Sequence, residues 1–363
     1  MKYFLLLVSL MTSIAASAQS GFKTIIDLKG LPDSVEITAR VQDEKQDKWQ
    51  FIKLKPVKGK ATIEGQSRMT DPATMYIYTP KGTISTFVQN GVTEKISGKA
   101  DDIKSLSYKQ KGAPWSKDFM TLNALTGEIE ADLQDAFSRY NSLTKEEKEH
   151  AIALQDRRES LKMNYYHSHP NSWITLSHMQ YQMQDMPREE VSAIYDALKP
   201  PYKESSYATT IFRFLTTQQI KPGDNIADFD IVATDQNGKK VKLSDYKGKY
   251  LVVDFSQRFC GACVMANRDI PQIAEKYADK VLFINYSCDD SEKDWKESIK
   301  RDNITWPSIW NGSGITGQDC LRYCVNSFPH FFIFNPEGDL IREWSGYGPG
   351  LFESRFKELG ITE

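Results

Sequence analysis

The chain has no cysteine before residue 260. Its five cysteines all lie in the last third of the 363 residues: Cys260, Cys263, Cys288, Cys320 and Cys324. A secreted scaffold held together by disulfides would spread its cysteines along the chain, so this distribution argues against that class. It indicates instead a redox site carried by one domain. Since the count is odd, at least one thiol is free or pairs only transiently.

An excess of charge of either sign is also missing. The 46 lysines and arginines nearly balance the 48 aspartates and glutamates, which leaves a formal net charge of −2. A protein that binds nucleic acid or an acidic membrane surface usually carries a clear basic excess. We therefore expect no nucleic acid among the partners.

Long uncharged hydrophobic runs are absent beyond the first residues. Lys2 precedes the apolar stretch Tyr3–Met11, which is too short to span a bilayer, and Ala16-Ser17-Ala18 offers a cleavage site. This pattern predicts a signal peptide over residues 1–18, with an uncleaved membrane helix as the alternative. The mature chain is then expected in the periplasm, without membrane insertion. No cysteine stands directly after the cleavage site, which disfavours a lipid anchor.

Residues 19–111 are predicted to form a β-rich, sandwich-like domain of unknown role. Short alternating runs such as Ser34–Ala39 are separated by turn residues such as Asn90-Gly91. The segment contains neither cysteine nor histidine. No catalytic group is expected there.

Residues 112–219 are predicted to form a helical segment. Thr144 and Glu147 have the spacing of a capping box. Three histidines lie close together in the sequence, but their spacing matches no metal motif, so we expect ordinary surface histidines and no metal. These are His167, His169 and His178. The apolar residues that recur at spacings of three and four and predict one face of a long helix are Phe119, Leu122, Leu125, Ile129, Leu133, Phe137 and Tyr140.

Residues 220–363 alternate between strand and helix patterns. This alternation predicts an α/β domain with a mixed central sheet flanked by helices. The expected strands are Ile226–Ala233, Val241–Leu243, Tyr250–Phe255, Val281–Tyr286, Phe331–Phe334 and Leu340–Trp344, and helices are expected from Cys260, around Ser291–Lys300 and over Leu351–Leu359.

The chemistry is predicted at Cys260 and Cys263. An apolar strand leads into this Cys-x-x-Cys, which stands at the start of a helix. The free N–H groups and the dipole of a helix N-terminus favour a thiolate, and a thiolate attacks disulfides. We expect Cys260 to attack and Cys263 to resolve the mixed disulfide, with Gly261 and Ala262 small enough to leave Cys260 open. Arg258 adds positive charge nearby.

Asp254 is a polar residue inside the apolar strand that leads to the cysteines. Burial of a carboxylate is costly unless the group has a role or a partner. We predict that burial raises its pKa and that it accepts the proton of Cys263 during exchange. The alternative is a carboxylate that reaches solvent or a neighbouring lysine.

These residues carry a family resemblance. The last domain, about residues 223–360, resembles the TlpA/ResA-type branch of the thioredoxin superfamily. The whole layout, a β-rich N-terminal domain, a helical middle and this last domain, also resembles exported oxidoreductases of Bacteroidetes-type bacteria. The matching motifs are Leu243-Ser244-Asp245-Tyr246-Lys247-Gly248-Lys249, Val253-Asp254-Phe255, Cys260-Gly261-Ala262-Cys263 and Tyr323-Cys324-Val325-Asn326-Ser327-Phe328-Pro329. The resemblance implies a thioredoxin-like fold, thiol–disulfide oxidoreductase activity, protein disulfides as substrates, a membrane electron donor and no cofactor.

The resemblance also implies a substrate-binding surface. It places a cis peptide bond between Phe328 and Pro329, opposite the cysteine pair, and assigns substrate contact to Phe259, Gly261 and Ala262 as well. The family usually has tryptophan where Phe259 stands and proline where Ala262 stands. We expect protein-disulfide reduction, with oxidase or isomerase activity as the alternative direction.

Other interpretations remain at this point. Cys260, Cys263, Cys320 and Cys324 form two close pairs, as in some zinc sites. A peroxidase would need a threonine shortly before Cys260, which is absent, and a non-catalytic binding protein is the third alternative.

Cys320 and Cys324 are expected in one helix, where they are badly placed to bond with each other, so a disulfide would more readily involve Cys288. The simpler alternative is that these three cysteines are buried small hydrophobic residues.

Overall fold

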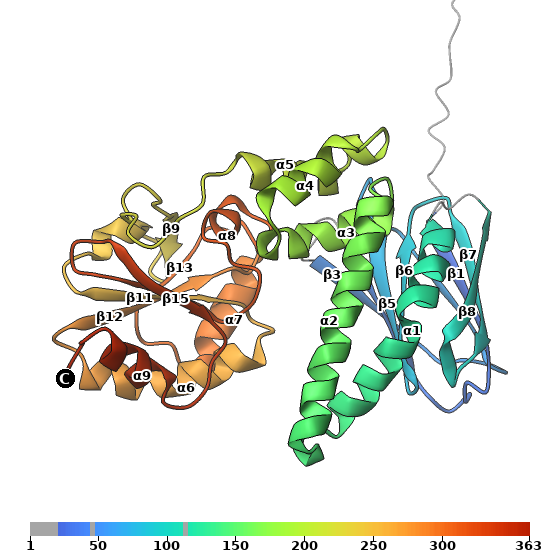
Figure 1. Cartoon of the computed structure of the whole chain (residues 1–363), viewed down its shortest axis with the longest axis horizontal. Coiled ribbons are helices and arrows are strands. Elements are labelled where there is room, and N and C mark those ends of the chain that lie inside the picture. The colour runs from blue at the N-terminus through green and yellow to red at the C-terminus, as the bar shows by residue number, and fades with distance from the viewer. Residues whose placement is uncertain (1–20, 44–47, 112–114) are drawn as a thin grey trace, which may run out of the picture. The chain divides into compact units, whose positions relative to one another are not determined.

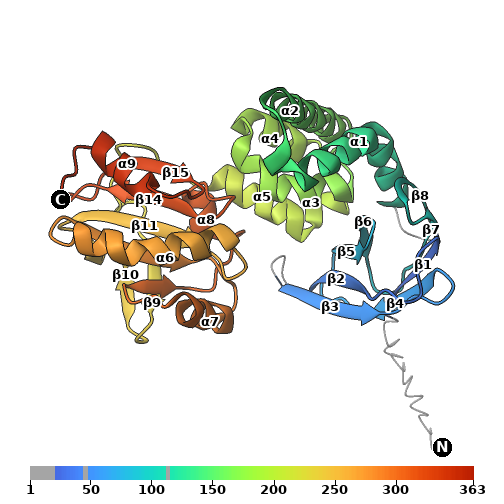
Figure 2. The same ribbon diagram turned by 90° about the horizontal axis from the view of Figure 1, so that it is seen from below.

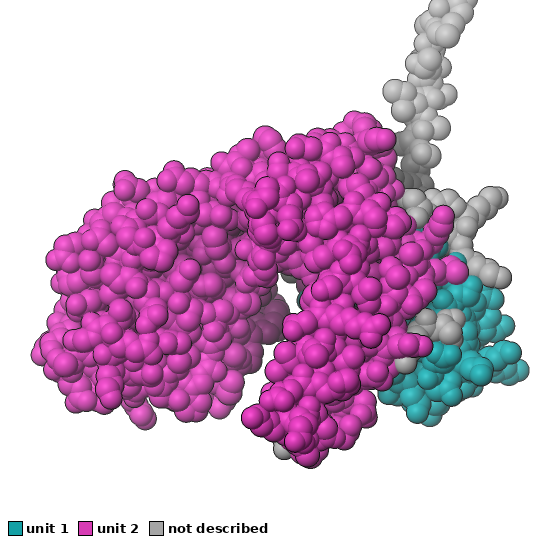
Figure 3. Space-filling view, in the orientation of Figure 1, with its two compact units in different colours: residues 1–41, 51–116 teal, residues 42–50, 117–363 magenta. Residues whose placement is uncertain are grey.

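The computed structural model describes residues 21–43, 48–111 and 115–363 (Figure 1). The expected signal peptide and the residues 112–114 lie outside this description. The chain divides into two compact units, residues 1–41 with 51–116 and residues 42–50 with 117–363 (Figure 3). The expected boundary near residue 220 falls inside the second unit, so the three-part division of the chain stays a prediction.

The N-terminal strands form two four-stranded sheets, which confirms the β-rich prediction for this region. Their orders are β4-β1-β7-β8 and β3-β2-β5-β6, and β1 and β7 run parallel. Buried and partly exposed residues alternate along β1, as expected for a strand with one face in a core. The strands are β1 (Phe22–Lys29), β2 (Ile37–Asp43), β3 (Lys48–Leu54), β4 (Lys60–Gly65), β5 (Ala73–Thr79), β6 (Gly82–Val88), β7 (Thr93–Lys99) and β8 (Asp102–Lys111).

Helices follow the strands, and the predicted capping box is present. The Thr144 hydroxyl accepts from the Glu147 N–H, and the Glu147 carboxylate accepts from the Thr144 N–H. No helix within the described part of the chain is long and apolar enough to cross a membrane. The helices are α1 (Trp115–Ser138), α2 (Lys145–Ser168), α3 (Trp173–Gln182), α4 (Arg188–Asp196) and α5 (Ser206–Thr216).

The predicted apolar face of α1 is only partly correct. Its buried stripe contains four of the expected residues, Phe119, Leu122, Ile129 and Leu133. Leu125 is exposed because the rotation of about 100° per residue carries it off this stripe. Phe137 and Tyr140 are exposed as well, at and beyond the last turn of the helix.

The C-terminal part forms a seven-stranded mixed sheet of order β10-β9-β13-β12-β11-β14-β15, as predicted for an α/β domain. Strand β11 lies inside the sheet, parallel to β12 and antiparallel to β14. The strands are β9 (Val232–Asp235), β10 (Lys240–Lys242), β11 (Tyr250–Ser256), β12 (Val281–Ser287), β13 (Ser308–Trp310), β14 (His330–Phe334) and β15 (Leu340–Ser345), and the helices are α6 (Gly261–Lys276), α7 (Glu292–Asp302), α8 (Gln318–Arg322) and α9 (Leu351–Glu358).

One predicted strand was wrong in its extent. Ile226 and Phe229 are buried, but they belong to a turn in which the Phe229 N–H donates to the Ile226 carbonyl. The strand β9 begins only at Val232. The error arose because a short run of buried apolar residues looks the same in a strand and in a tightly packed turn.

The two faces of the sheet pack against different elements. One face carries Val252, which packs with Ala266 and Ile270 of α6 and with side chains of α9. The other face carries Phe255 and packs against α8 and the turn before β9. Figures 1 and 2 show α6 and α9 along the first of these faces.

Phe255 is the centre of an aromatic cluster on that second face. Its ring centroid lies 4.8 Å from Tyr286, 5.1 Å from Tyr323 and 5.2 Å from Phe332. The side chain is fully buried. It therefore joins three chain segments directly below the end of β11.

We predict that Phe255→Ala lowers the free energy of unfolding by about 3–5 kcal/mol, because it leaves a cavity among these rings. The matched control is Phe259→Ala, since Phe259 is 83% exposed and four residues away. That change should alter stability by no more than about 0.5 kcal/mol. Urea denaturation of both variants measures the difference, and equal losses would contradict the assigned packing.

Candidate active site

Cys260 and Cys263 form a disulfide at the start of α6. Cys260 is the N-cap residue, and its sulfur accepts a hydrogen bond from the Cys263 N–H at 3.0 Å. The two sulfurs differ in access, because Cys260 is partly exposed whereas Cys263 is 1% exposed. Only Cys260 can meet a bulky partner, and its sulfur already sits where helix N–H groups stabilise negative charge.

The residues beside Cys260 leave it open. Phe259 projects its ring into solvent. Gly261 is exposed, and a Cβ added there would meet no atom of the described chain within 4 Å. The chain's own packing therefore does not require glycine at this position. The space is available to a second molecule that approaches Cys260.

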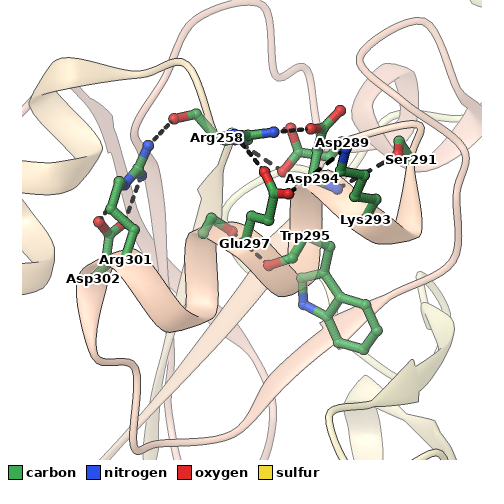
Figure 4. A network of polar contacts seen from close by, with 10 residues as sticks. Arg258, Asp289, Ser291, Lys293, Asp294, Trp295, Glu297, Arg301 and Asp302 are labelled. Atoms are coloured by element: carbon green, nitrogen blue, oxygen red, sulfur yellow. Dashed lines mark hydrogen bonds and ion pairs between the residues drawn. The ribbon is translucent and has the colours of Figure 1, made fainter.

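Arg258 is bound to α7 rather than free beside the cysteines (Figure 4). The Arg258 guanidinium pairs with Asp294 and Glu297, and the backbone N–H of Arg258 donates to the Asp289 carboxylate at 3.0 Å. Arg301, which also pairs with Asp302, donates to the Arg258 carbonyl. The sequence suggested that Arg258 adds positive charge at Cys260. In the structure two carboxylates oppose its one charge, so its main effect is to attach the loop before Cys260 to α7.

Asp254 is fully buried in β11. It has the same orientation in the strand as Val252, which packs on α6, so its carboxylate faces the helix that carries Cys263. Burial raises the pKa of Asp254 to about 7; a weak hydrogen bond from Asn285 opposes this rise, and the nearby Asp302 adds to it. Within the described residues, Oδ1 of Asp254 has no hydrogen-bond partner. Such a carboxyl can take or release a proton near neutral pH.

A chain of buried hydrogen bonds reaches Asp254 from α7, and the sequence reasoning missed it. Trp295 Nε1 donates to the Ser308 hydroxyl, which donates to Oδ1 of Asn285, both at 2.8 Å. The Asn285 amide donates to Ser256 at 2.6 Å and to Asp254 at 3.4 Å. Asn285 is a polar residue within the apolar strand β12, which is the same sequence signal that singled out Asp254 in β11.

Asn267 and Asp302 complete the polar surroundings. Asn267 lies on α6, one turn beyond Cys263, and its amide donates to the Asp302 carboxylate at 3.0 Å. The side chain of Asp302 is only 2% exposed and pairs with Arg301. A buried negative charge is thus held near Asp254, which favours the protonated form of that carboxyl.

The peptide bond between Phe328 and Pro329 is cis, as the resemblance implied. The next residue, His330, pairs with Phe255 across β14 and β11. Because the cysteine loop begins after Ser256, Pro329 lies at the same edge of the sheet as that loop. Pro329 itself is buried, and Phe328 packs half-buried against the core.

The other cysteines do not join the site. Helix α8 contains Cys320 but ends at Arg322, and Cys324 follows it with a positive φ of 55°, so the prediction of one helix for both was wrong. Among the residues whose structure is described, no group of three or more histidines, cysteines or carboxylates is placed to hold a metal.

The three histidines of the helical segment have separate partners. His178 shares a 2.5 Å hydrogen bond with the Tyr166 hydroxyl, and burial lowers its pKa to about 4. His169 stacks on Tyr165, and His167 lies 3.3 Å from a Glu190 oxygen. The expectation of surface histidines was therefore wrong for His178, which is a packed side chain.

Known proteins resemble part of this chain. The AhpC/TSA family model matches residues 222–342. A thiol-disulfide oxidoreductase ResA of Bacillus cereus is 27% identical over 135 residues, 37% of this chain and 75% of the relative. ResA of Bacillus subtilis (strain 168) is 26% identical over 138 residues, with 37% and 72% covered. The thioredoxin domain of a thiol-disulfide oxidoreductase from Bacteroides vulgatus is 26% identical and matches 39% of this chain and 99% of its own, with a TM-score of 0.35.

The C-terminal domain is thus a thioredoxin-like domain of the AhpC/TSA family. Two of its relatives are ResA proteins named thiol-disulfide oxidoreductases, which confirms the resemblance expected from the sequence and supports thiol–disulfide oxidoreductase as the enzyme class. The matches cover about a third of the chain. The family model lies wholly within the C-terminal part, at residues 222–342.

We predict that Asp254→Asn stabilises the oxidised protein at pH 8 but hardly at pH 4. The folded-state pKa of Asp254, about 7, lies above the ordinary value of 3.8. Between these pH values the folded form therefore keeps a proton that the unfolded form has lost. The free energy of unfolding therefore falls as the pH rises from about 4 to 7, by at most about 4 kcal/mol for a pKa difference of about three units. The asparagine variant avoids that loss.

Urea denaturation across this pH range measures the effect. Asp279→Asn serves as control, since Asp279 is exposed and should show no such pH dependence. A parallel pH profile for Asp254→Asn and the unchanged protein would contradict the buried, raised-pKa carboxyl.

Proposed function

We propose that the protein is an exported, periplasmic thiol–disulfide oxidoreductase that reduces disulfides in other proteins. The observation that carries this proposal is the asymmetry of the cysteine pair. Cys260 is accessible at the N-cap of α6, whereas Cys263 is buried on the helix face toward Asp254, a carboxyl with a pKa of about 7. An exchange enzyme needs one thiol for the substrate and one protected thiol with a proton acceptor nearby.

In the first step the Cys260 thiolate attacks one sulfur of a substrate disulfide. A bond forms between Cys260 and that sulfur, the substrate disulfide breaks, and the second substrate sulfur leaves as a thiolate that takes up a proton. The N–H groups of the first turn of α6, including that of Cys263, favour the Cys260 thiolate.

In the second step Cys263 resolves the mixed disulfide. Its thiol gives a proton to Asp254, and the resulting thiolate attacks the sulfur of Cys260. The Cys260–Cys263 disulfide forms, and the first substrate sulfur leaves as a thiolate. Asp254 suits this role because its burial keeps the carboxyl titratable near neutral pH rather than permanently ionised.

Substrate contact is assigned to the open side of Cys260. Phe259 offers an exposed apolar ring, Gly261 and Ala262 leave space, and the Phe328–Pro329 segment supplies backbone at the same edge of the sheet. The N-terminal signal-peptide pattern supports the periplasmic location. There the oxidised pair requires a membrane electron donor to return it to the dithiol.

The two cysteines should respond differently to replacement by serine. Cys260→Ser removes the nucleophile and should reduce the rate of insulin reduction by at least about 10³-fold, to background. Cys263→Ser retains the nucleophile but cannot resolve, so it should accumulate mixed disulfides with substrate. Non-reducing gel electrophoresis and mass spectrometry detect these adducts. Adducts on Cys260→Ser instead would reverse the assigned roles.

The direction of the reaction is tested by the reduction potential of the Cys260–Cys263 pair. Thiol trapping and mass spectrometry across a dithiothreitol or glutathione series should give a value near about −270 mV, which suits a reductase. A value near about −120 to −180 mV would make the protein an oxidase or isomerase. If no disulfide forms in any buffer, the proposal of an oxidoreductase site at this pair fails.

A further inference from the structure

The C-terminal domain contains a second pair of adjacent sulfurs, away from the exposed site. Cys288 follows β12 and Cys320 lies in α8, and their sulfur atoms are 3.3 Å apart. Both side chains are almost completely buried, at 1% and 0% exposure. The two residues are 32 positions apart in sequence, so the fold brings them together.

Each cysteine is attached to a segment that borders the Cys260–Cys263 site. The Cys288 N–H donates to the Ser256 carbonyl at the end of β11, from which the loop to Cys260 starts. The Cys320 carbonyl accepts from the Val325 N–H, within the segment that leads to Pro329. A bond between these sulfurs would tie the support of the cysteine loop to the segment before the cis-proline.

Once the domain has folded, burial keeps both thiols away from dissolved oxidants and reductants. Burial, together with the neighbouring Cys320, raises the pKa of Cys288 well above its ordinary value. A buried thiol without thiolate character exchanges slowly. Such a pair is suited to a permanent bond made during folding, whereas the accessible Cys260 is suited to repeated exchange.

We propose that Cys288 and Cys320 form a structural disulfide in the mature protein. This inference rests on the proposed location outside the cytoplasm, where disulfides persist, and not on the redox role of Cys260. Two thiols and one disulfide oxidant, R–S–S–R, give the Cys288–Cys320 bond and two R–SH. The sulfurs must approach from 3.3 Å to about 2.05 Å.

Cys324 is the thiol left over from the odd count. It lies outside α8, and burial raises its pKa to about 11. Full oxidation therefore yields two disulfides of different reducibility, Cys260–Cys263 and Cys288–Cys320, and one free thiol at Cys324.

Peptide mapping tests this pairing directly. The reduced, denatured mature chain is refolded with glutathione disulfide, denatured again, alkylated with N-ethylmaleimide and digested with trypsin. Cleavage at lysine and arginine separates the relevant cysteines into residues 259–268, 281–293, 302–322 and 323–342. We expect peptides 281–293 and 302–322 joined by a disulfide, and alkylation at Cys324 alone. Alkylated Cys288 and Cys320 in protein whose Cys260–Cys263 bond is closed would overturn the proposal.

A graded reduction separates the two disulfides. Dithiothreitol applied to the folded protein should open only Cys260–Cys263, so that subsequent denaturation and alkylation modify three cysteines. The same reagent in urea should give five. If all five react after native reduction at the same rate, Cys288–Cys320 is not a protected structural bond and the proposal is wrong.

The double variant Cys288→Ala/Cys320→Ala provides the stability test, with Cys324→Ala as the matched control. In the unchanged protein and in the control, complete reduction opens the loop closed by Cys288–Cys320. It should therefore lower their melting temperatures by about 5–10 °C more than that of the double variant, which has no such loop. Equal shifts in all three proteins would contradict the cross-link. The double variant should still reduce insulin, so failure of the exchange activity and failure of the cross-link are distinguishable.

Discussion

Strand β11 holds the site together because it has hydrogen-bonded neighbours on both sides and ends where the chemistry begins. Ser256, its last residue, pairs with Ser287 of β12, and Phe255 pairs with His330, which follows Pro329. The cysteine loop, the loop after β12 and the cis-proline segment therefore meet at one edge. Their separation is set by the sheet and not by the loops themselves. This anchoring holds Cys260 in place while leaving it partly exposed.

The buried carboxyl of Asp254 is the main electrostatic feature of the site that β11 supports. A carboxyl with a pKa of about 7 costs stability at neutral pH, and the surrounding residues do not remove that cost. Asn285 offers only a long hydrogen bond, and Asp302 raises the pKa further. The domain thus retains an unfavourable group below its reactive pair, as expected where a proton must move. Arg258, which the sequence suggested as a positive charge near Cys260, pairs instead with Asp294 and Glu297 of α7.

Patterns confined to one segment predicted much of the fold and the candidate site. The apolar run before Cys260, the helix after it and the Thr144–Glu147 cap depend on neighbours within a few residues, and all appear in the structure. Predictions failed where a segment depends on what packs over it. The turn around Ile226 looked like a strand, and Leu125 looked like a core residue, because apolar character alone does not say which partner covers it.

The redox motif, the strand before it and helix after it, and the ionisable group within β11 follow from the amino-acid sequence alone. They depend on residue types and short spacings, which act through local backbone geometry. Three further features came only from the folded chain: Asn285 connects Asp254 to α7, Arg258 is neutralised, and Cys288 lies against Cys320 rather than Cys324. Those pairings join residues about 30 or more positions apart, and their distances are set by how the sheet and helices pack.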